Sequence, residues 1–273
     1  MLLVDYINKN LNTNNLDKLC FVHNLTLSDY ENAQNKLTQK PCNIFPNINP
    51  IYLYYGKPLF NPCKKEEFDK LNSITWPMCL IIDAKSIPIE KSYPFDTGAY
   101  HGEPKWVGDD MTRFFKDDDG NPIPVCEFEL GTELDTICRY IYTFFENNNN
   151  YFGSADNKWA PKCRDDIAIC GEGKEELVVS KLYDFLRGTL KKLDNRCKVV
   201  EIQAVGEYNF SKVVKIFILP ANNDDIIKSM PNATPITYST ATPRTSEDFI
   251  NEITERFRSH LEDIEIMPAK SLG

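Results

Sequence analysis

The chain has 273 residues, of which 42% are hydrophobic and 26% are charged, so it can bury a substantial core and is not a long disordered segment. Its formal net charge of -9 at pH 7 argues against a general nucleic-acid coat or a protein that binds membrane surfaces. No apolar run reaches the roughly 18 to 20 residues of a membrane span, and the first residues lack the basic region and apolar core of a signal peptide.

The first part of the chain predicts a helix, a strand and a second, capped helix. Residues 2–19 have the pattern of a short helix with Leu3, Ile7 and Leu11 on one face, and residues 20–23 predict a strand. Ser28 and Glu31 have the S-x-x-E spacing of a capping box. We therefore expect a helix from there to about residue 37.

The next strands are rich in aromatic and apolar residues. Residues 51–55 predict a strand with Tyr52 and Tyr54 on one face and Tyr55 on the other. Residues 78–83 form an apolar run typical of a central strand, and Cys79 within it has the setting of a reduced core thiol. The nine cysteines include no C-x-x-C pair, which disfavours a zinc ribbon. Reduced cysteines in apolar runs favour a cytoplasmic protein.

The remaining elements alternate between helices and strands. Residues 66–71 predict a short helix, 93–100 a loop, 116–122 an exposed turn and 126–129 an alternating strand. We expect helices at 132–146, 174–193, 224–230 and 246–261, and strands at 199–203 and 213–219. Four asparagines at 147–150 predict a loop that runs to about residue 166. No long linker interrupts this series, so the sequence predicts one α+β domain over residues 1–273.

Two polar side chains in an apolar strand mark a candidate site. Glu201 and Gln203 lie two residues apart, so their side chains project from the same face of the strand. An ionised carboxylate is costly to bury unless it is paired or used in chemistry. The non-functional alternative is a structural carboxylate that pairs with Lys198 or Arg196.

Three segments together resemble ADP-ribosyltransferases of the PARP-like and DarT-like type, which carry a His, a Tyr and a Glu in this order. Residues 21–26, Phe-Val-His-Asn-Leu-Thr, resemble their opening strand, and residues 51–60 their aromatic strand. Residues 200–203, Val-Glu-Ile-Gln, resemble the strand that carries the catalytic acid. The resemblance implies a split or mixed β-sheet flanked by helices and NAD as the substrate, with no metal.

The resemblance also implies roles for particular residues. Glu201 would be the catalytic acid, since a carboxylate beside the ribose stabilises the oxocarbenium-like transition state that forms as nicotinamide leaves. A Tyr would stack on nicotinamide and a Lys would meet the pyrophosphate. The residues that the resemblance assigns to NAD binding are His23, Thr26, Tyr54, Tyr55, Lys57 and Gln203. His23 also has a purely structural interpretation as a strand-end His, and the tyrosines have one as packed residues of a sheet.

The acceptor of the ADP-ribose would be a protein or a nucleic acid. The Glu-x-Gln pattern, in place of Glu-x-Glu, disfavours arginine as the target. A cluster of basic residues before Glu201 would suit a phosphate-rich acceptor, although on a helix such residues are usually a solvated face. The family context implies a toxin or antiphage effector and leaves room for an inhibitory partner. The basic residues are Lys181, Arg187, Lys191, Lys192, Arg196 and Lys198.

Two other classes of function remain open. One is a protein of the same fold that binds a protein or a nucleotide without catalysis. The other is a metal-dependent hydrolase or nuclease that uses Asp96, Glu127 or Glu129, although Asp96 also has the setting of a turn former.

Overall fold

The computed structural model describes residues 2–9, 18–42, 45, 47–59, 76–101, 111, 114–155, 177–188, 195–240 and 246–260. It combines helices with a seven-stranded, mostly antiparallel sheet of order β5-β6-β3-β1-β4-β8-β9. The chain divides into two compact units, so the single domain expected over residues 1–273 stays a prediction. The first unit comprises residues 1–18, 89–201 and 271–273, and the second comprises residues 19–88 and 202–270.

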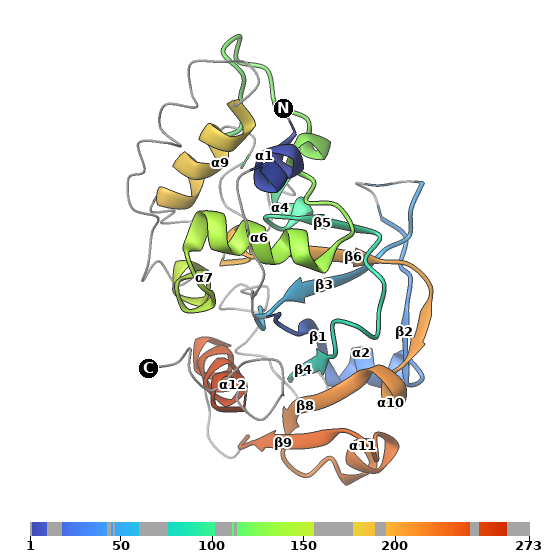
Figure 1. Ribbon diagram of the computed structural model, residues 1–273. Helices are drawn as coiled ribbons and strands as arrows, with labels where there is room; N and C mark the ends of the chain where they lie inside the picture. The colour runs from blue at the N-terminus through green and yellow to red at the C-terminus, as the bar shows by residue number, and fades with distance from the viewer. Residues whose placement is uncertain are drawn as a thin grey trace. The chain divides into compact units, whose positions relative to one another are not determined.

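The second unit contains most of the strands. Figure 1 shows β3, β1, β4, β8 and β9 in succession, with α12 against β8 and β9. The described strands of this unit and their bounds are β1 (Phe21–Thr26), β2 (Lys36–Thr38), β3 (Ile51–Tyr55), β4 (Pro77–Ile82), β6 (Glu201–Ala204, whose first residue belongs to the first unit), β7 (Glu207–Asn209), β8 (Val214–Pro220) and β9 (Thr234–Tyr238). Its described helices are α2 (Leu27–Asn32), α10 (Phe210–Val213), α11 (Asp224–Ser229) and α12 (Ser246–His260).

Burial explains why β4 lies at the centre of this unit. All six of its residues are buried, as expected for a strand covered on both faces. It pairs antiparallel with β1 on one side and with β8 on the other, for example Cys79 with Asn24 and with Ile218. β8 then pairs with β9 in parallel. The predicted central strand is therefore confirmed.

Gly56 allows the chain to leave β3. Its φ of 67° lies in the left-handed region, and a Cβ at this position would lie 2.3 Å from Cδ1 of Leu19. Its N–H donates to the carbonyl of Cys20 at 2.8 Å. Only glycine fits this close approach, so the end of β3 is fixed against the start of β1.

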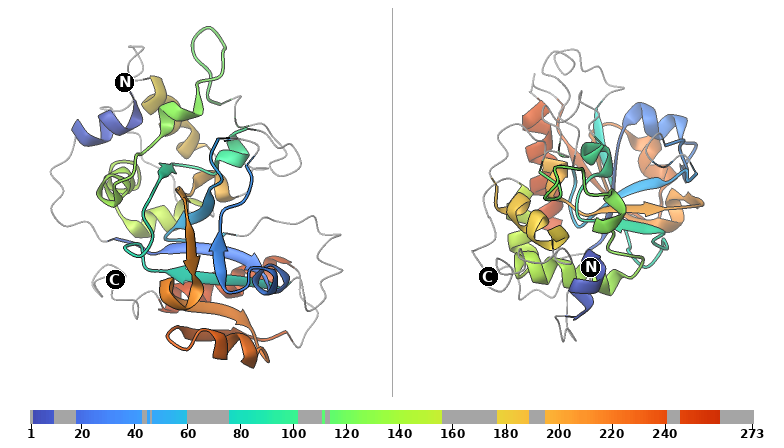
Figure 2. Two further views of the ribbon diagram at one scale, coloured as in Figure 1. Left: turned by 90° about the vertical axis from the view of Figure 1, so that its right-hand side faces the viewer. Right: turned by 90° about the horizontal axis from the view of Figure 1, so that it is seen from above.

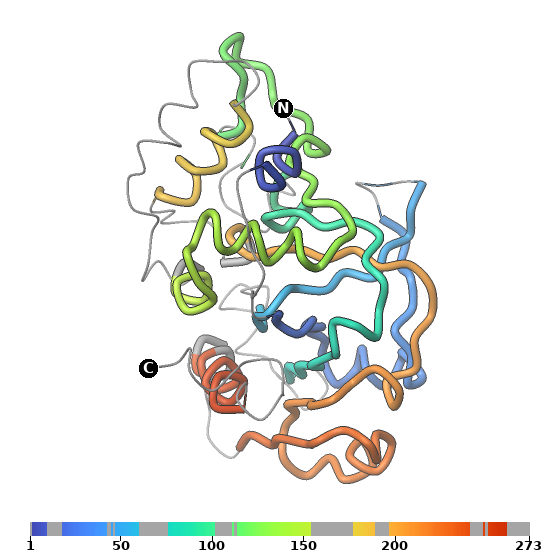
Figure 3. The backbone as a smooth tube through the Cα atoms, in the orientation of Figure 1, coloured from blue at the N-terminus to red at the C-terminus, as the bar shows by residue number. Residues whose placement is uncertain are grey.

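The start of α2 differs from the sequence prediction. Thr26, not Ser28, is the N-cap: its hydroxyl accepts from the Asp29 N–H, and the Asp29 carboxylate accepts from the Thr26 N–H. The capping box placed at Ser28 and Glu31 was therefore wrong by two residues. The helix ends at Asn32, and residues 36–38 form β2, which pairs with β7 and runs beside it in Figure 3.

The first unit is mainly helical. Its described elements are α1 (Leu3–Lys9), β5 (Lys91–Tyr93), α4 (Thr97–Tyr100), the 3-10 helix η2 (Val125–Phe128), α6 (Leu134–Phe145), α7 (Asn148–Ala155), α9 (Leu177–Arg187) and the 3-10 helix η4 (Asn195–Lys198). Both views of Figure 2 show the dark-blue α1 beside the green α6. An ion pair of 2.7 Å joins Lys18 to Asp135 at the start of α6.

An aromatic cluster forms the core around α4. Phe95 stacks on Tyr100 and on Phe115, with ring centroids 5.5 and 5.3 Å apart. Phe128 meets Phe115 edge to face at 4.8 Å, and Phe185 of α9 lies 4.9 Å from Phe115. All five rings are buried, so this cluster holds the segment 95–100 in place.

Two other predictions in the first unit were wrong. Residues 126–129 lie in η2 and its end rather than in a strand. The asparagine run does not begin a loop but enters α7, whose first turn is held by Asn147 accepting from the Asn150 N–H at 2.9 Å. Tyr151 and Phe152 on α7 are buried, and this packing outweighs the weak helix propensity of asparagine. The helix expected at residues 66–71 lies outside the described residues.

The basic cluster before Glu201 does not form one exposed face. Lys198 is 4% exposed, and its ammonium donates to the carbonyls of Leu186 and Gly188 at 3.2 and 3.0 Å. It therefore satisfies the last carbonyls of α9. Arg187 lies over the ring of Tyr183 at 5.5 Å. Residues 191 and 192, and the side chain of Arg196, lie outside the description.

Candidate functional site

A cavity of about 260 Å³ in the second unit brings together residues from five of its elements and the segments between them. It lies where β1 and β3 separate. The two strands are in register at Phe21 with Tyr55 and at Val22 with Tyr54, whereas β1 stays paired with β4 as far as Thr26. The residues that line the cavity are His23, Asn24, Leu25, Asp29, Ala33, Lys36, Leu37, Thr38, Lys40, Pro50, Ile51, Tyr52, Tyr54 and Phe210.

His23 occupies the point of separation. Its Nδ1 lies 2.9 Å from the carbonyl oxygen of Tyr52, which can only accept a hydrogen bond. Nδ1 therefore carries the proton, and in the neutral ring Nε2 is an acceptor. Burial lowers the pKa of the imidazole and the Lys40 ammonium lowers it too, against the opposing effects of the Tyr52 carbonyl and Asp29. The cavity thus contains a neutral imidazole at neutral pH.

We expect His23 to make the protein less stable in acid. The unfolded imidazole takes up a proton near its ordinary pKa of 6.5, whereas the folded one resists protonation because its pKa is lowered. The unfolded state therefore binds more protons below pH 6.5, and the free energy of unfolding falls by at most about 1.4 kcal/mol per pH unit until the folded pKa is reached. Urea unfolding at pH 7.5 and 5.5 should show a smaller loss in His23→Gln than in the wild type. An equal loss in both proteins contradicts this assignment.

The tyrosines of β3 lie on two opposite faces of the strand, as the alternation predicted. Tyr52 and Tyr54 are partly buried and line the cavity, and the hydroxyl of Tyr52 lies 2.7 Å from Sγ of Cys42. Tyr55 points into the core, where its hydroxyl accepts from the Leu19 N–H at 2.8 Å and its ring meets Phe21 edge to face. Of the two tyrosines expected to stack on a ligand, only Tyr54 lines the cavity.

The other residues assigned to NAD binding lie elsewhere. The hydroxyl of Thr26 is used in the N-cap of α2, where it also donates to the Asp29 carboxylate at 2.8 Å. Lys57 is 1% exposed and Gln203 is fully buried, and neither is among the residues that line the cavity. The structure therefore brings together His23 and Tyr54 but not these three.

The cavity contains polar residues that sequence reasoning missed. The amide nitrogen of Asn24 donates to the Leu59 carbonyl, which fixes the orientation of the amide. Its Oδ1 is buried without a hydrogen-bond partner among the described residues. Lys36 and Lys40 also line the cavity. These two lysines reach the cavity because the chain turns between α2 and β2. The sequence pattern predicted a continuous helix there, to about residue 37, and so did not predict this turn.

Glu201 belongs to the first unit and is 2% exposed. Its Oε2 accepts from the Thr97 N–H at 3.0 Å, and its Oε1 accepts from the Thr97 hydroxyl at 2.8 Å. Thr97 is the first residue of α4, and the preceding Asp96 caps that helix by accepting from the Ala99 N–H at 2.9 Å. Thr97 thus binds both oxygens of the carboxylate, and the Asp96 cap holds the start of α4.

Tyr93 and Glu129 form part of the polar surroundings of Glu201. Burial raises the pKa of the Tyr93 hydroxyl well above its ordinary value, and the negative charges of Glu129 and Glu201 raise it further. Glu129 also pairs with Lys91 at 3.5 Å. The Tyr93 hydroxyl is therefore protonated at any physiological pH and can act only through hydrogen bonds.

The candidate residues of a metal-dependent hydrolase are not brought together as a metal site. Asp96 acts as a helix cap, as its turn setting suggested, and Glu129 pairs with a lysine. Across the parts of the chain that the structure describes, no three His, Cys, Asp or Glu side chains are grouped so that they could hold a metal ion. In the same parts, no helix is both long and apolar enough to cross a membrane.

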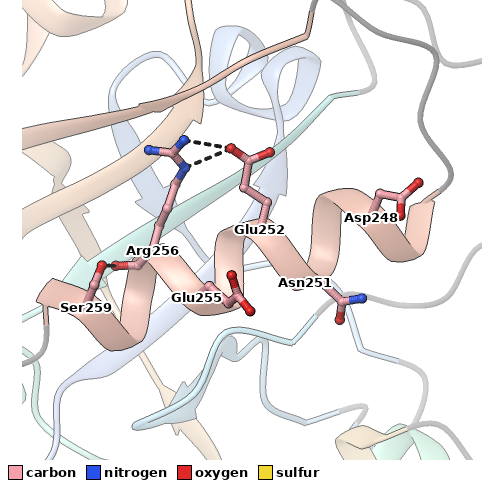
Figure 4. Close-up of a pocket in the computed structure, with 6 residues that line it drawn as sticks. All are labelled: Asp248, Asn251, Glu252, Glu255, Arg256 and Ser259. Carbon is pink, nitrogen blue, oxygen red and sulfur yellow. Dashed lines mark hydrogen bonds and ion pairs between the residues drawn. The ribbon is translucent and has the colours of Figure 1, made fainter.

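A second hollow lies along α12 and offers little chemistry. Figure 4 shows its lining residues on one helix, with Arg256 turned toward Glu252. The guanidinium donates to Oε1 of Glu252 from Nη2 at 2.7 Å and from Nε at 3.0 Å. The described lining residues are Asp248, Asn251, Glu252, Glu255, Arg256 and Ser259, all from α12. This arrangement is typical of a solvated helix face stabilised by an i,i+4 ion pair.

Comparison of the sequence with protein-family models gives no match, and comparison with curated proteins gives none either.

Proposed function

We propose that the protein cleaves NAD and transfers ADP-ribose to a protein or nucleic-acid acceptor, with the cavity of the second unit as part of the NAD site. The observation that carries the proposal is that His23 and Tyr54 line one cavity. They come from two of the three segments that resemble ADP-ribosyltransferases. The split between β1 and β3 at this point also supports an ADP-ribosyltransferase-like fold.

The cavity offers groups that suit half of a dinucleotide. Nε2 of the neutral His23 can accept a hydrogen bond from a ribose hydroxyl, and the ring of Tyr54 can pack on nicotinamide. The volume of about 260 Å³ lies just below the range of about 300–1,000 Å³ that is typical of ligand pockets. It would hold nicotinamide and its ribose, while the rest of NAD would extend beyond it.

In this proposal Glu201 is the catalytic acid. The carboxylate would stabilise positive charge on the ribose as the bond to nicotinamide breaks. Thr97 would keep the carboxylate in one orientation through its two hydrogen bonds. The buried thiols of Cys20 and Cys79 fit the cytoplasm, where the proposal places the enzyme as a toxin or antiphage effector that a partner could hold in check.

The test is the release of nicotinamide from NAD by the purified protein, with and without cell lysate as a source of acceptor. We expect Tyr54→Ala to lower kcat/KM about tenfold or more, because stacking of a base on an aromatic ring contributes about 1–3 kcal/mol. Tyr54→Phe keeps the ring and should keep most of the activity. Tyr142→Ala, at an exposed position of α6, is the control for unrelated loss.

A wild-type protein that neither releases nicotinamide nor binds NAD by calorimetry contradicts this proposal. The second candidate function is a protein of this fold that binds a nucleotide without catalysis. A specific observation favours it: both oxygens of Glu201 already accept hydrogen bonds from Thr97, so the carboxylate has a structural use. Binding of NAD without turnover would support this second function.

A further inference from the structure

We propose that Lys40 binds a phosphate group of a nucleoside phosphate held in the cavity. The inference names the anion-binding group of the NAD site and depends on the proposed function only for the identity of the base. Lys40 takes the phosphate-binding role that the resemblance gave to Lys57, because Lys57 is buried and does not line the cavity.

The charged groups around the cavity leave Lys40 as the available cation. Nζ of Lys36 lies 2.7 Å from Oε1 of Glu207, across the β2–β7 pair. Oδ2 of Asp29 accepts from the Thr26 N–H and hydroxyl at 3.1 and 2.8 Å. Lys40 is exposed at the rim, and it has no ion pair among the residues that the structure describes. An ammonium group in this position is suited to a phosphate oxygen.

The position of Lys40 connects the anion site to the sugar site. Both Lys40 and His23 line this cavity, and the charge of Lys40 is one of the causes that lower the pKa of the His23 imidazole. A ligand in the cavity can therefore present a phosphate to Lys40 and a hydroxyl to Nε2 of His23. A nucleoside phosphate carries both groups.

The uncharged groups of the cavity favour the same class of ligand. Nε2 of the neutral His23 is an acceptor, so it selects a ligand that has hydroxyl or amine donors. Phe210 adds a fixed aromatic wall, because it stacks on Tyr30 with centroids 5.2 Å apart at 16°. Donors, an aromatic ring and a phosphate together describe a nucleotide more closely than a free sugar or a fatty acid.

The experiment compares ligands that differ only in the phosphate. Calorimetry would measure binding of nicotinamide mononucleotide and nicotinamide riboside, and of AMP and adenosine, to the full chain. We expect each phosphate to strengthen binding at least tenfold in the wild type, which is about 1.4 kcal/mol. In Lys40→Gln this advantage should fall to about twofold or less. The matched control is Lys36→Gln, which removes the same charge from an ammonium that is already paired and should keep the advantage.

The outcomes separate this inference from the proposed function. If both nicotinamide ligands bind equally well and Lys40→Gln changes neither, the inference is overturned while the NAD site stands. If only the adenine pair binds, with the phosphate preference lost in Lys40→Gln, the inference stands and the nicotinamide site is overturned. If none of the four ligands binds, both are overturned. A preference that Lys36→Gln removes and Lys40→Gln leaves intact also overturns the inference.

Discussion

Glu201→Ala is expected to lower the free energy of unfolding by about 2–4 kcal/mol. The carboxylate is 2% exposed, and its removal leaves the Thr97 N–H and hydroxyl without their acceptors in a buried setting. Urea unfolding followed by circular dichroism measures this loss. Glu133→Ala is the matched control, because Glu133 is exposed and makes no capping hydrogen bond at the start of α6. Stability equal to the wild type would contradict the structural use of the carboxylate.

The same substitution is therefore a poor test of catalysis, and Glu201→Gln is better. The amide keeps the size of the side chain and one acceptor oxygen, so we expect a smaller loss of stability, of about 1–2 kcal/mol. If Glu201 is the catalytic acid, nicotinamide release should fall by about 100-fold or more in a variant that remains folded. Full activity in folded Glu201→Gln would remove Glu201 from the reaction. If Glu201→Gln lowers the free energy of unfolding while the wild type itself releases no nicotinamide, the binding protein without catalysis is favoured.

Phe95→Ala is expected to lower the free energy of unfolding by about 3–5 kcal/mol, the usual cost of emptying a buried aromatic position. Phe95 is fully buried and its ring contacts Tyr100, Phe115 and Phe128. Phe95→Leu refills part of the space and should cost about 1.5 kcal/mol or less. Thermal and urea unfolding measure both variants.

The control for Phe95 is Tyr142→Ala, since Tyr142 is an exposed aromatic residue of α6 and should change stability by less than about 0.5 kcal/mol. Because Asp96 and Thr97 directly follow Phe95, the larger change should also weaken the hold on Glu201. A Phe95→Ala protein within about 1 kcal/mol of the wild type would mean that the aromatic cluster does not support α4.

The apolar strands β3 and β4 were predictable from the sequence, because their local patterns match their burial. The apolar run of β4 and the alternation of β3 each appear directly in the structure. The weaker elements were missed for physical reasons. Only two of the five residues of β9 are buried, and the strand contains Pro235. A proline argues against a strand except at the edge of a sheet, so the sequence has no clear strand pattern here. α7 begins in asparagines, and only the burial of Tyr151 and Phe152 shows why it is helical.

The candidate site was predictable only in part. His23 and Tyr54 could be chosen from local motifs because each lies within a strand that the sequence predicts. The partner of Glu201 could not, since Thr97 lies 104 residues away and its role depends on the fold around it. Asn24 and Lys40 carry no local signal either. Their importance comes from the place where β1 and β3 separate.

The order of the two units along the chain has a consequence for synthesis. The second unit is made of residues 19–88 and 202–270, with most of the first unit encoded between them. β4 finds its neighbour β8 only after this long insertion, and Phe210 joins the cavity wall at the same late stage. A ribosome that has made the first 200 residues has therefore not yet supplied a complete ligand site. Whatever the cavity binds, the nascent chain becomes competent to bind it only after Phe210 and β8 have been synthesised.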